Sequence, residues 1–107
     1  MTDQDFSNSW AIDPVAEKEE AERKRLLALQ RQDLISSLSK FLETRGGRRW
    51  MLGILDLAHT FETSFHENPH YMAFREGERN IGLRIIADLQ DVSADMLSKV
   101  LKERENG

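Results

Sequence analysis

No glycine or proline interrupts the chain from Val15 to Thr44, and this stretch restricts the fold more than any other feature of the sequence. Directly before it, Asp13 and Pro14 form the pattern that opens a helix, with Asp as the N-cap and Pro at the first helical position. The sequence therefore predicts a helix of roughly 45 Å at about 1.5 Å per residue. A break near Asp33, a second N-cap candidate, is the alternative.

The two halves of this predicted helix differ in character. The half up to residue 33 is dominated by charge between Glu17 and Arg25, so it should lie in water or bind a partner. An apolar stripe begins before that boundary, at Leu27, and continues into the second half through Leu34, Leu38 and Phe41. Three of these are seven residues apart, but the run is too short to define a coiled coil.

Three more helices are expected after this one. Gly46-Gly47 should end the long helix, and helices are predicted over 48–62, from Pro69 to about residue 90, and over 94–104. The 69–90 helix should face the core with one stripe that consists of Phe74, Gly77, Ile81, Ile85 and Leu89. Its two glycines, Gly77 and Gly82, should let a neighbouring backbone come close.

The predicted fold is thus all-α: a small bundle of three core helices within residues 34–104, from which a charged helix, 13–33, projects. Residues 1–12 are expected to form a flexible tail. Phe6 and Trp10 are large apolar residues in this polar segment, which makes them candidates for docking onto a partner.

Composition excludes several classes of function. The chain of 107 residues has no cysteine, so disulfides, thiolate zinc sites and cysteine nucleophiles are excluded. Its net charge of −4 argues against a dedicated binder of duplex DNA, which needs positive charge to neutralise phosphates. No apolar run approaches the roughly 20 residues that cross a bilayer, and no signal peptide is evident, so we expect no membrane contact and synthesis in the cytoplasm.

The string His66-Glu67-Asn68-Pro69-His70 matches the H-E-x-x-H pattern of zinc proteases. That pattern works only inside a helix, and proline within it should instead begin a helix and leave His66 outside. A looser metal site drawn from His59, Glu62, His66 and His70 is an alternative. We expect solvent-exposed histidines, no metal, no cofactor, no catalytic residue and no enzymatic activity.

Two further groups of polar residues are candidate binding sites. Arg45, Arg48 and Arg49 surround the double glycine and could hold a phosphate or carboxylate; the alternative is a charged turn in which Glu43 or Glu62 pairs with them. Glu76, Arg79 and Asn80 should lie near the inner edge of their helix, either as an internal hydrogen-bond network or as contacts between subunits.

Three strings together resemble a family of small proteins of tailed bacteriophages, typified by a member from a Bordetella podovirus. They are Phe41 to Arg49, Ser64-Phe65, and Ala73 to Leu83. The family pattern is approximately F-L-x-T-x-x-G-R-R, then S-F, then F-x-E-G-x-R-x-x-G-L, and the resemblance covers about residues 41–102. One departure is Gly46-Gly47, where the pattern has a single glycine at the second position.

The resemblance implies a phage gene near the head and tail structural genes, and no catalytic residues. Within the motif, Phe74, Gly77 and Gly82 are interpreted as packing residues. We therefore expect a non-enzymatic virion component with a structural or assembly role, whether internal and ejected, at the head–tail fitting or as a scaffold. It would bind other phage structural proteins and could form a homo-oligomer, with partner contacts through Phe6, Trp10, Arg48, Arg49, Glu76 and Arg79. A nucleic-acid-binding or host-regulating small protein is the alternative.

Overall fold

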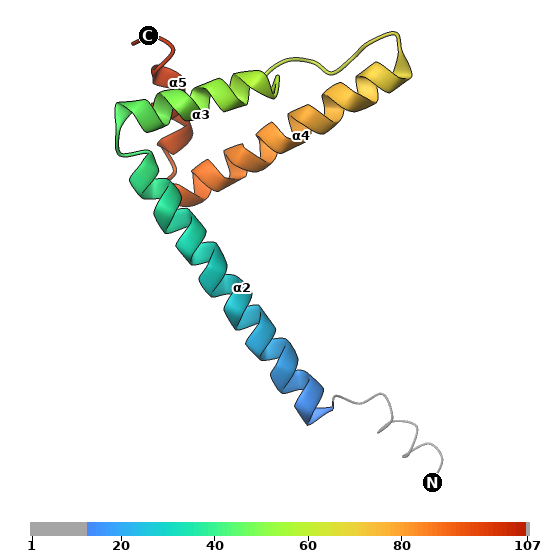
Figure 1. Cartoon of the computed structure of the whole chain (residues 1–107), viewed down its shortest axis with the longest axis vertical. Helices are drawn as coiled ribbons and strands as arrows, with labels where there is room; N and C mark the ends of the chain where they lie inside the picture. The colour runs from blue at the N-terminus through green and yellow to red at the C-terminus, as the bar shows by residue number, and fades with distance from the viewer. Residues whose placement is uncertain (1–12, 107) are drawn as a thin grey trace. The chain divides into compact units, whose positions relative to one another are not determined.

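The computed structural model describes residues 13–106, and every regular element in that range is a helix. The helices are α2 (Pro14–Phe41), α3 (Arg45–Leu57), α4 (Pro69–Val92) and α5 (Met96–Lys102) (Figure 1). The all-α prediction is confirmed. The internal contacts divide the chain into two units, one up to Leu34 and one from Ile35 onward, and each is described by itself below.

Helix α2 begins where the sequence predicts and continues without a break at Asp33. The Asp13 carboxylate accepts a hydrogen bond from the backbone N–H of Val15 at 3.0 Å, so Asp13 acts as the cap. The ion pairs along the charged half join residues three apart, Glu22 with Arg25 and Glu20 with Arg23. No residue of α2 is fully buried, although Leu38 near its end packs against the core of the second unit. Local pairing and helix propensity are therefore the main internal support of the part up to Leu34.

The double glycine does not link two helices, as the sequence had suggested, but lies in the first turn of α3. Thr44 is the N-cap, and its hydroxyl accepts a hydrogen bond from the Gly47 N–H at 3.1 Å. Gly47 is buried against the end of α2: a Cβ placed there would come within 1.8 Å of the Phe41 carbonyl oxygen. A Cβ at Gly46 would meet no atom of the described chain within 4 Å. Only the second glycine is therefore required by the packing.

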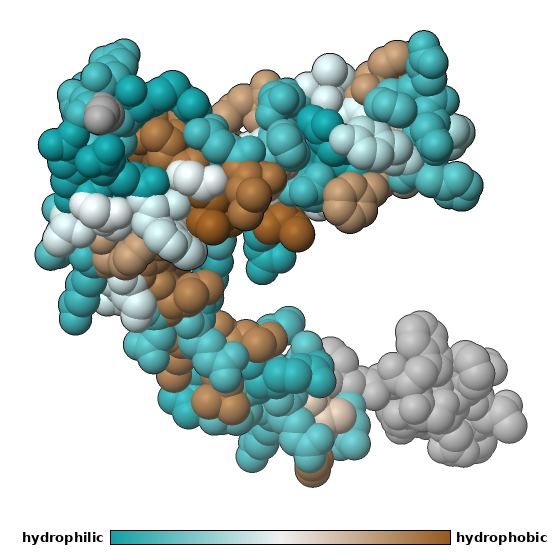
Figure 2. Space-filling view, turned by 45° about the horizontal axis from the view of Figure 1, so that its top comes forward, coloured by the Kyte–Doolittle hydropathy of each residue, from teal (hydrophilic) through white to brown (hydrophobic). Residues whose placement is uncertain are grey.

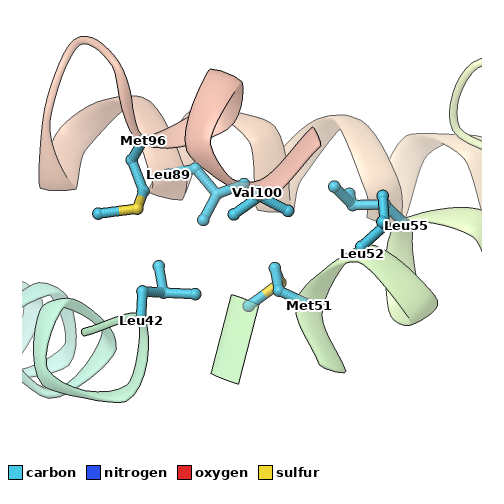
Figure 3. Packing of buried hydrophobic residues seen from close by; sticks show 7 residues of the cluster. All are labelled: Leu42, Met51, Leu52, Leu55, Leu89, Met96 and Val100. Carbon is cyan, nitrogen blue, oxygen red and sulfur yellow. The ribbon is translucent and has the colours of Figure 1, made fainter. Parts of the chain in front are cut away.

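Helices α3, α4 and α5 contact one another and enclose a small apolar core (Figure 1). Leu42 enters it from the segment between α2 and α3. The buried hydrophobic residues, shown in Figure 3, are Leu42, Met51, Leu52, Leu55, Leu89, Met96 and Val100. Seven side chains are a small core for a domain of this size, and it follows that many other large hydrophobic residues stay at the surface.

Helix α3 ends at Leu57, earlier than the predicted Glu62, because the chain turns sharply at His59. His59 has a φ of 52°, a left-handed conformation that stops a helix. The turn brings Thr60 into a buried position, where its hydroxyl donates to the Leu55 carbonyl at 2.8 Å. Thr60 rests on Gly82 of α4, where a Cβ would lie 1.9 Å from the threonine oxygen. Gly82 thus admits a close neighbour, but this neighbour is the Thr60 side chain and not a backbone as predicted.

We predict opposite effects on stability for alanine at the two adjacent glycines. Gly47→Ala should lower the free energy of unfolding by about 1–3 kcal/mol, because the new Cβ forces the end of α2 away from α3. Gly46→Ala should be neutral or stabilising by up to about 1 kcal/mol, since its Cβ has open space and alanine favours a helix. Urea denaturation followed by far-UV circular dichroism measures both, and equal losses in the two variants would contradict the assignment of close packing to Gly47.

Candidate functional site

The arginine cluster at the start of α3 binds a carboxylate that belongs to the chain itself. Glu103, just after α5, is 4% exposed. Its carboxylate accepts hydrogen bonds from Arg48 Nε at 3.0 Å and from Arg45 Nε at 3.3 Å. Arg49 is exposed. The sequence had suggested Glu43 or Glu62 as the carboxylate beside these arginines, and Glu103 holds that place instead.

Arg48 also supports the end of the long helix. Its Nη1 donates to the carbonyl oxygens of Leu42 at 3.0 Å and Glu43 at 3.1 Å. These are backbone acceptors that the last turn of a helix leaves without intrahelical donors. One guanidinium therefore joins the end of α2, the start of α3 and the residue after α5, and this cluster serves the fold.

Neighbouring contacts strengthen the same junction. Arg45 also donates to the backbone carbonyl of Asn106. Arg104 forms a two-pronged ion pair with Asp56 of α3, with nitrogen–oxygen distances of 2.9 and 3.2 Å. Paired bonds of this kind fix orientation as well as distance, so the residues after α5 are held against α3.

The electrostatics of the junction follow from this geometry. The hydrogen bond from Arg48 is the main reason that the pKa of the Glu103 carboxyl lies below its ordinary value, and the positive charges of Arg48 and Arg45 act in the same direction. Burial of Glu103 opposes this shift but does not overcome it. Glu103 is therefore ionised wherever the protein is folded near neutral pH.

The histidines do not form the arrangement of a zinc protease. Pro69 begins α4, and Asn68 is its N-cap, accepting from the N–H of His70 at 2.9 Å and of Tyr71 at 3.3 Å. His66 therefore lies outside the helix, as predicted. His59 instead faces Glu62, with 2.7 Å between Nδ1 and the carboxylate. Within residues 13–106, no three histidine, aspartate or glutamate side chains are grouped as metal ligands would be.

Of the three polar residues singled out on α4, which are Glu76, Arg79 and Asn80, only the first two lie close together. Glu76 accepts a hydrogen bond from the Ser64 hydroxyl and lies 3.7 Å from Arg79 Nη1. Both residues are half-buried, whereas Asn80 is exposed, so its predicted place at the inner edge is wrong. Arg79 lines an open depression of about 500 Å³ with Leu83, Ile86 and residues 60–64. Ser64 and Glu76 thus tie the 58–68 connection to α4.

The predicted core stripe of α4 is wrong along its first half. Phe74 is 64% and Ile81 62% exposed, and Gly77 between them has no atom of the described chain within 4 Å of a built Cβ. The helix instead turns its Gly82 and Leu89 side inward. The reason is that Gly82 must meet Thr60, and this contact fixes the rotation of α4. The packing roles expected for Phe74 and Gly77 are not fulfilled within the chain.

The exposed hydrophobic residues of α4 lie next to exposed hydrophobic residues of α3. A groove of about 200 Å³ between the helices is lined by Ile54, Leu57, Ala58, Glu78 and Ile81. Trp50 lies on the same side of α3 as Ile54 and Leu57, at helical spacing, and its ring meets that of Phe41 edge-on at 5.6 Å. We call Trp50, Leu57, Phe74 and Ile81, with this groove, the α3–α4 apolar face. Figure 2 shows hydrophobic side chains at the surface of this helical region and along α2.

Two other sets of apolar residues belong to the N-terminal part of the chain. Phe6 and Trp10, the predicted docking residues, lie outside the described residues 13–106. In the first unit, Leu26, Leu27 and Leu29 of α2 are each about half exposed. Among the described helices, none combines the length and apolar character needed to cross a bilayer.

These features define an all-helical protein in which Arg45 and Arg48 bind Glu103 of the same chain. Many of its large hydrophobic residues are exposed. The family model of the Bbp19-like phage proteins matches residues 39–100, which is more than half of the chain. The chain therefore belongs to this bacteriophage family, and the resemblance seen in its motifs is confirmed. The match covers the end of α2, all of α3 and α4, and most of α5. No curated protein and no solved structure matches the chain.

We predict that Glu103→Gln lowers the thermal unfolding midpoint at neutral pH, because it removes the charge that Arg48 and Arg45 bind. Since the pKa of Glu103 is lowered by folding, its contribution is present above the unfolded pKa, near 4.5, and is lost as pH falls through the lower folded pKa. The variant should therefore lose less stability than the wild type below pH 4.5.

Thermal unfolding followed by circular dichroism between neutral and acidic pH checks this prediction. Glu105→Gln is the matched control, because Glu105 is exposed and two residues away. Some pH dependence should remain in the Glu103 variant, since the Ser93 hydroxyl lowers the pKa of Asp95. Identical pH profiles for the wild type and Glu103→Gln would show that the junction does not depend on this carboxylate.

Proposed function

We propose that this phage protein is a non-enzymatic structural or assembly component that binds other virion proteins. The observation that carries the proposal is the state of α2 in the first unit, where none of the residues from Pro14 to Leu34 is buried. An isolated helix gains little stability from local interactions, and most helices in proteins depend on packing of an apolar side. Residues 13–34 therefore fit a segment that acquires its packing from a partner.

The exposed residues of this segment suggest the chemistry of that partner. Leu26, Leu27, Leu29 and Leu34 are 48–57% exposed, and they follow a stretch of ion pairs between Glu20 and Arg25. Exposed leucines beside a solvated charged stretch are suited to an apolar groove with a polar rim, the common way in which a helix binds a protein. Such binding to another protein is required in each of the roles that remain open, whether in the particle interior, at the head–tail fitting or in a scaffold.

The nucleic-acid alternative loses its main support from the geometry at α3. It rested on Arg45, Arg48 and Arg49, with Trp50 beside them. Two of these arginines donate to Glu103, so less positive charge is offered to a phosphate. A host-regulating role would use the same leucine-bearing helix, and it differs from the leading proposal only in the identity of the bound protein.

The test is incorporation into the particle of the phage that encodes the chain. Leu26, Leu27 and Leu29 are changed together to Ser, and quantitative mass spectrometry of purified virions measures the copy number relative to wild type. We expect the copy number to fall at least about tenfold. Loss of leucines that become buried against the partner weakens such an interface by orders of magnitude. Gln30→Ser with Gln32→Ser is the control, an equally exposed change without apolar loss.

Deletion of residues 1–32 should have the same effect while the unit from Ile35 onward keeps its helical circular dichroism. Wild-type copy number in the leucine variant would refute binding through α2. Absence of the unaltered protein from mature virions would favour a scaffold that leaves, or the host-regulating alternative, and an affinity pull-down from infected cells would separate these two.

A further inference from the structure

The α3–α4 apolar face has a repeated pattern that neither the core nor the cluster at Glu103 explains. On α3, Trp50, Gly53 and Leu57 follow one another at spacings of three and four residues. On α4, Phe74, Gly77 and Ile81 do the same, in the same order of aromatic, glycine and aliphatic residue. Spacings of three and four place each trio on one side of its helix.

The two glycines in this pattern have no function within the chain. A Cβ at Gly53 or at Gly77 would meet no atom of the described residues within 4 Å. Glycine in a helix interior costs roughly 1 kcal/mol relative to alanine. Gly47 and Gly82 offset that cost by admitting a close neighbour, whereas Gly53 and Gly77 are exposed, with open space above them, on the same helix faces as Trp50 and Phe74.

The extent of the exposed apolar surface is somewhat smaller than one side of a standard protein interface. Leu57, Phe74, Ile81 and Trp50 are between 58% and 70% exposed. Since a large apolar side chain presents on the order of 200 Å² when fully exposed, these four offer about 500 Å². That is most of the roughly 800 Å² that each partner contributes to a standard interface.

We infer that the α3–α4 apolar face binds a second copy of this chain. The face carries exposed aromatic rings together with glycines whose space is open, and two-fold symmetry brings the same face of both copies together, so that a ring of one copy can lie over a glycine of the other. The ring of Phe74 or Trp50 in one copy then packs over Gly77 or Gly53 of the other. Glu78 is the one charged residue among the described residues that line the groove, so the face suits an apolar partner surface rather than a charged one.

Substitution of the open glycines tests this inference without disturbing the single chain. Gly77→Leu places a side chain in the open space above Gly77 on α4, where its Cβ meets no other part of the described chain. In sedimentation equilibrium, the wild-type full chain should show twice its mass of 12.4 kDa, and Gly77→Leu should raise the dimer dissociation constant by about tenfold or more. Gly53→Leu is the second variant and should weaken the dimer in the same way.

The matched control is Ala87→Leu, which adds bulk at an exposed position of α4 outside the trio. It should dimerise as the wild type does, and all variants should keep the helical circular dichroism of the folded chain. A wild-type chain that stays monomeric at every concentration would overturn the inference and leave the face to a different protein.

Two other results would also overturn it. A wild-type dissociation constant in both glycine variants would place dimer formation elsewhere on the chain. Loss of the dimer after deletion of residues 1–12 alone would identify that segment as the occupant of the face. Because these measurements need no virion, they are independent of the incorporation test, and either proposal can fail while the other stands.

Discussion

The structure depends on one buried ion pair, in which Arg48 holds Glu103 at 3.0 Å. A buried carboxylate without a partner would be costly, and Arg48 removes that cost while it donates to the carbonyls of Leu42 and Glu43. The same side chain therefore fixes where α2 ends and where the residues after α5 are placed. The small apolar core packs the helices together. Arg48 fixes how the end of α2, the start of α3 and the residue after α5 are placed against one another.

A core of so few side chains leaves a large share of the apolar residues in water. Surface hydrophobic residues scattered singly need no explanation, but the trios on α3 and α4 each share one side of a helix, and one member of each, Leu57 and Ile81, lines the same groove. The leucines of α2 form a second such set in the other unit of the chain. Each of the two proposals made above rests on one of these two sets of exposed apolar residues.

Much of the fold could be predicted from the sequence because its signals are local. Asp13-Pro14 and Asn68-Pro69 cap the helices that they precede, and Gly82 accepts a close neighbour. The rotation of α4 could not be predicted, because Phe74 and Ile81 satisfy the helical period whether they face a core or a partner. The partner of Arg48 could not be predicted either. Glu43 and Glu62 lie nearer to Arg48 along the chain, and Glu103 comes close to Arg48 only when the chain folds.

The position of Glu103 also bears on when this protein can fold. Arg48 and Glu103 are 55 residues apart, and they lie at opposite ends of the segment that builds the core. While the ribosome is still synthesising α5, the start of α3 has no carboxylate to bind and Leu55 lacks its neighbour Val100. The contacts of Arg48 with Glu103 and of the core with Val100 can therefore form only after the residues of α5 and the residue that follows it have been synthesised.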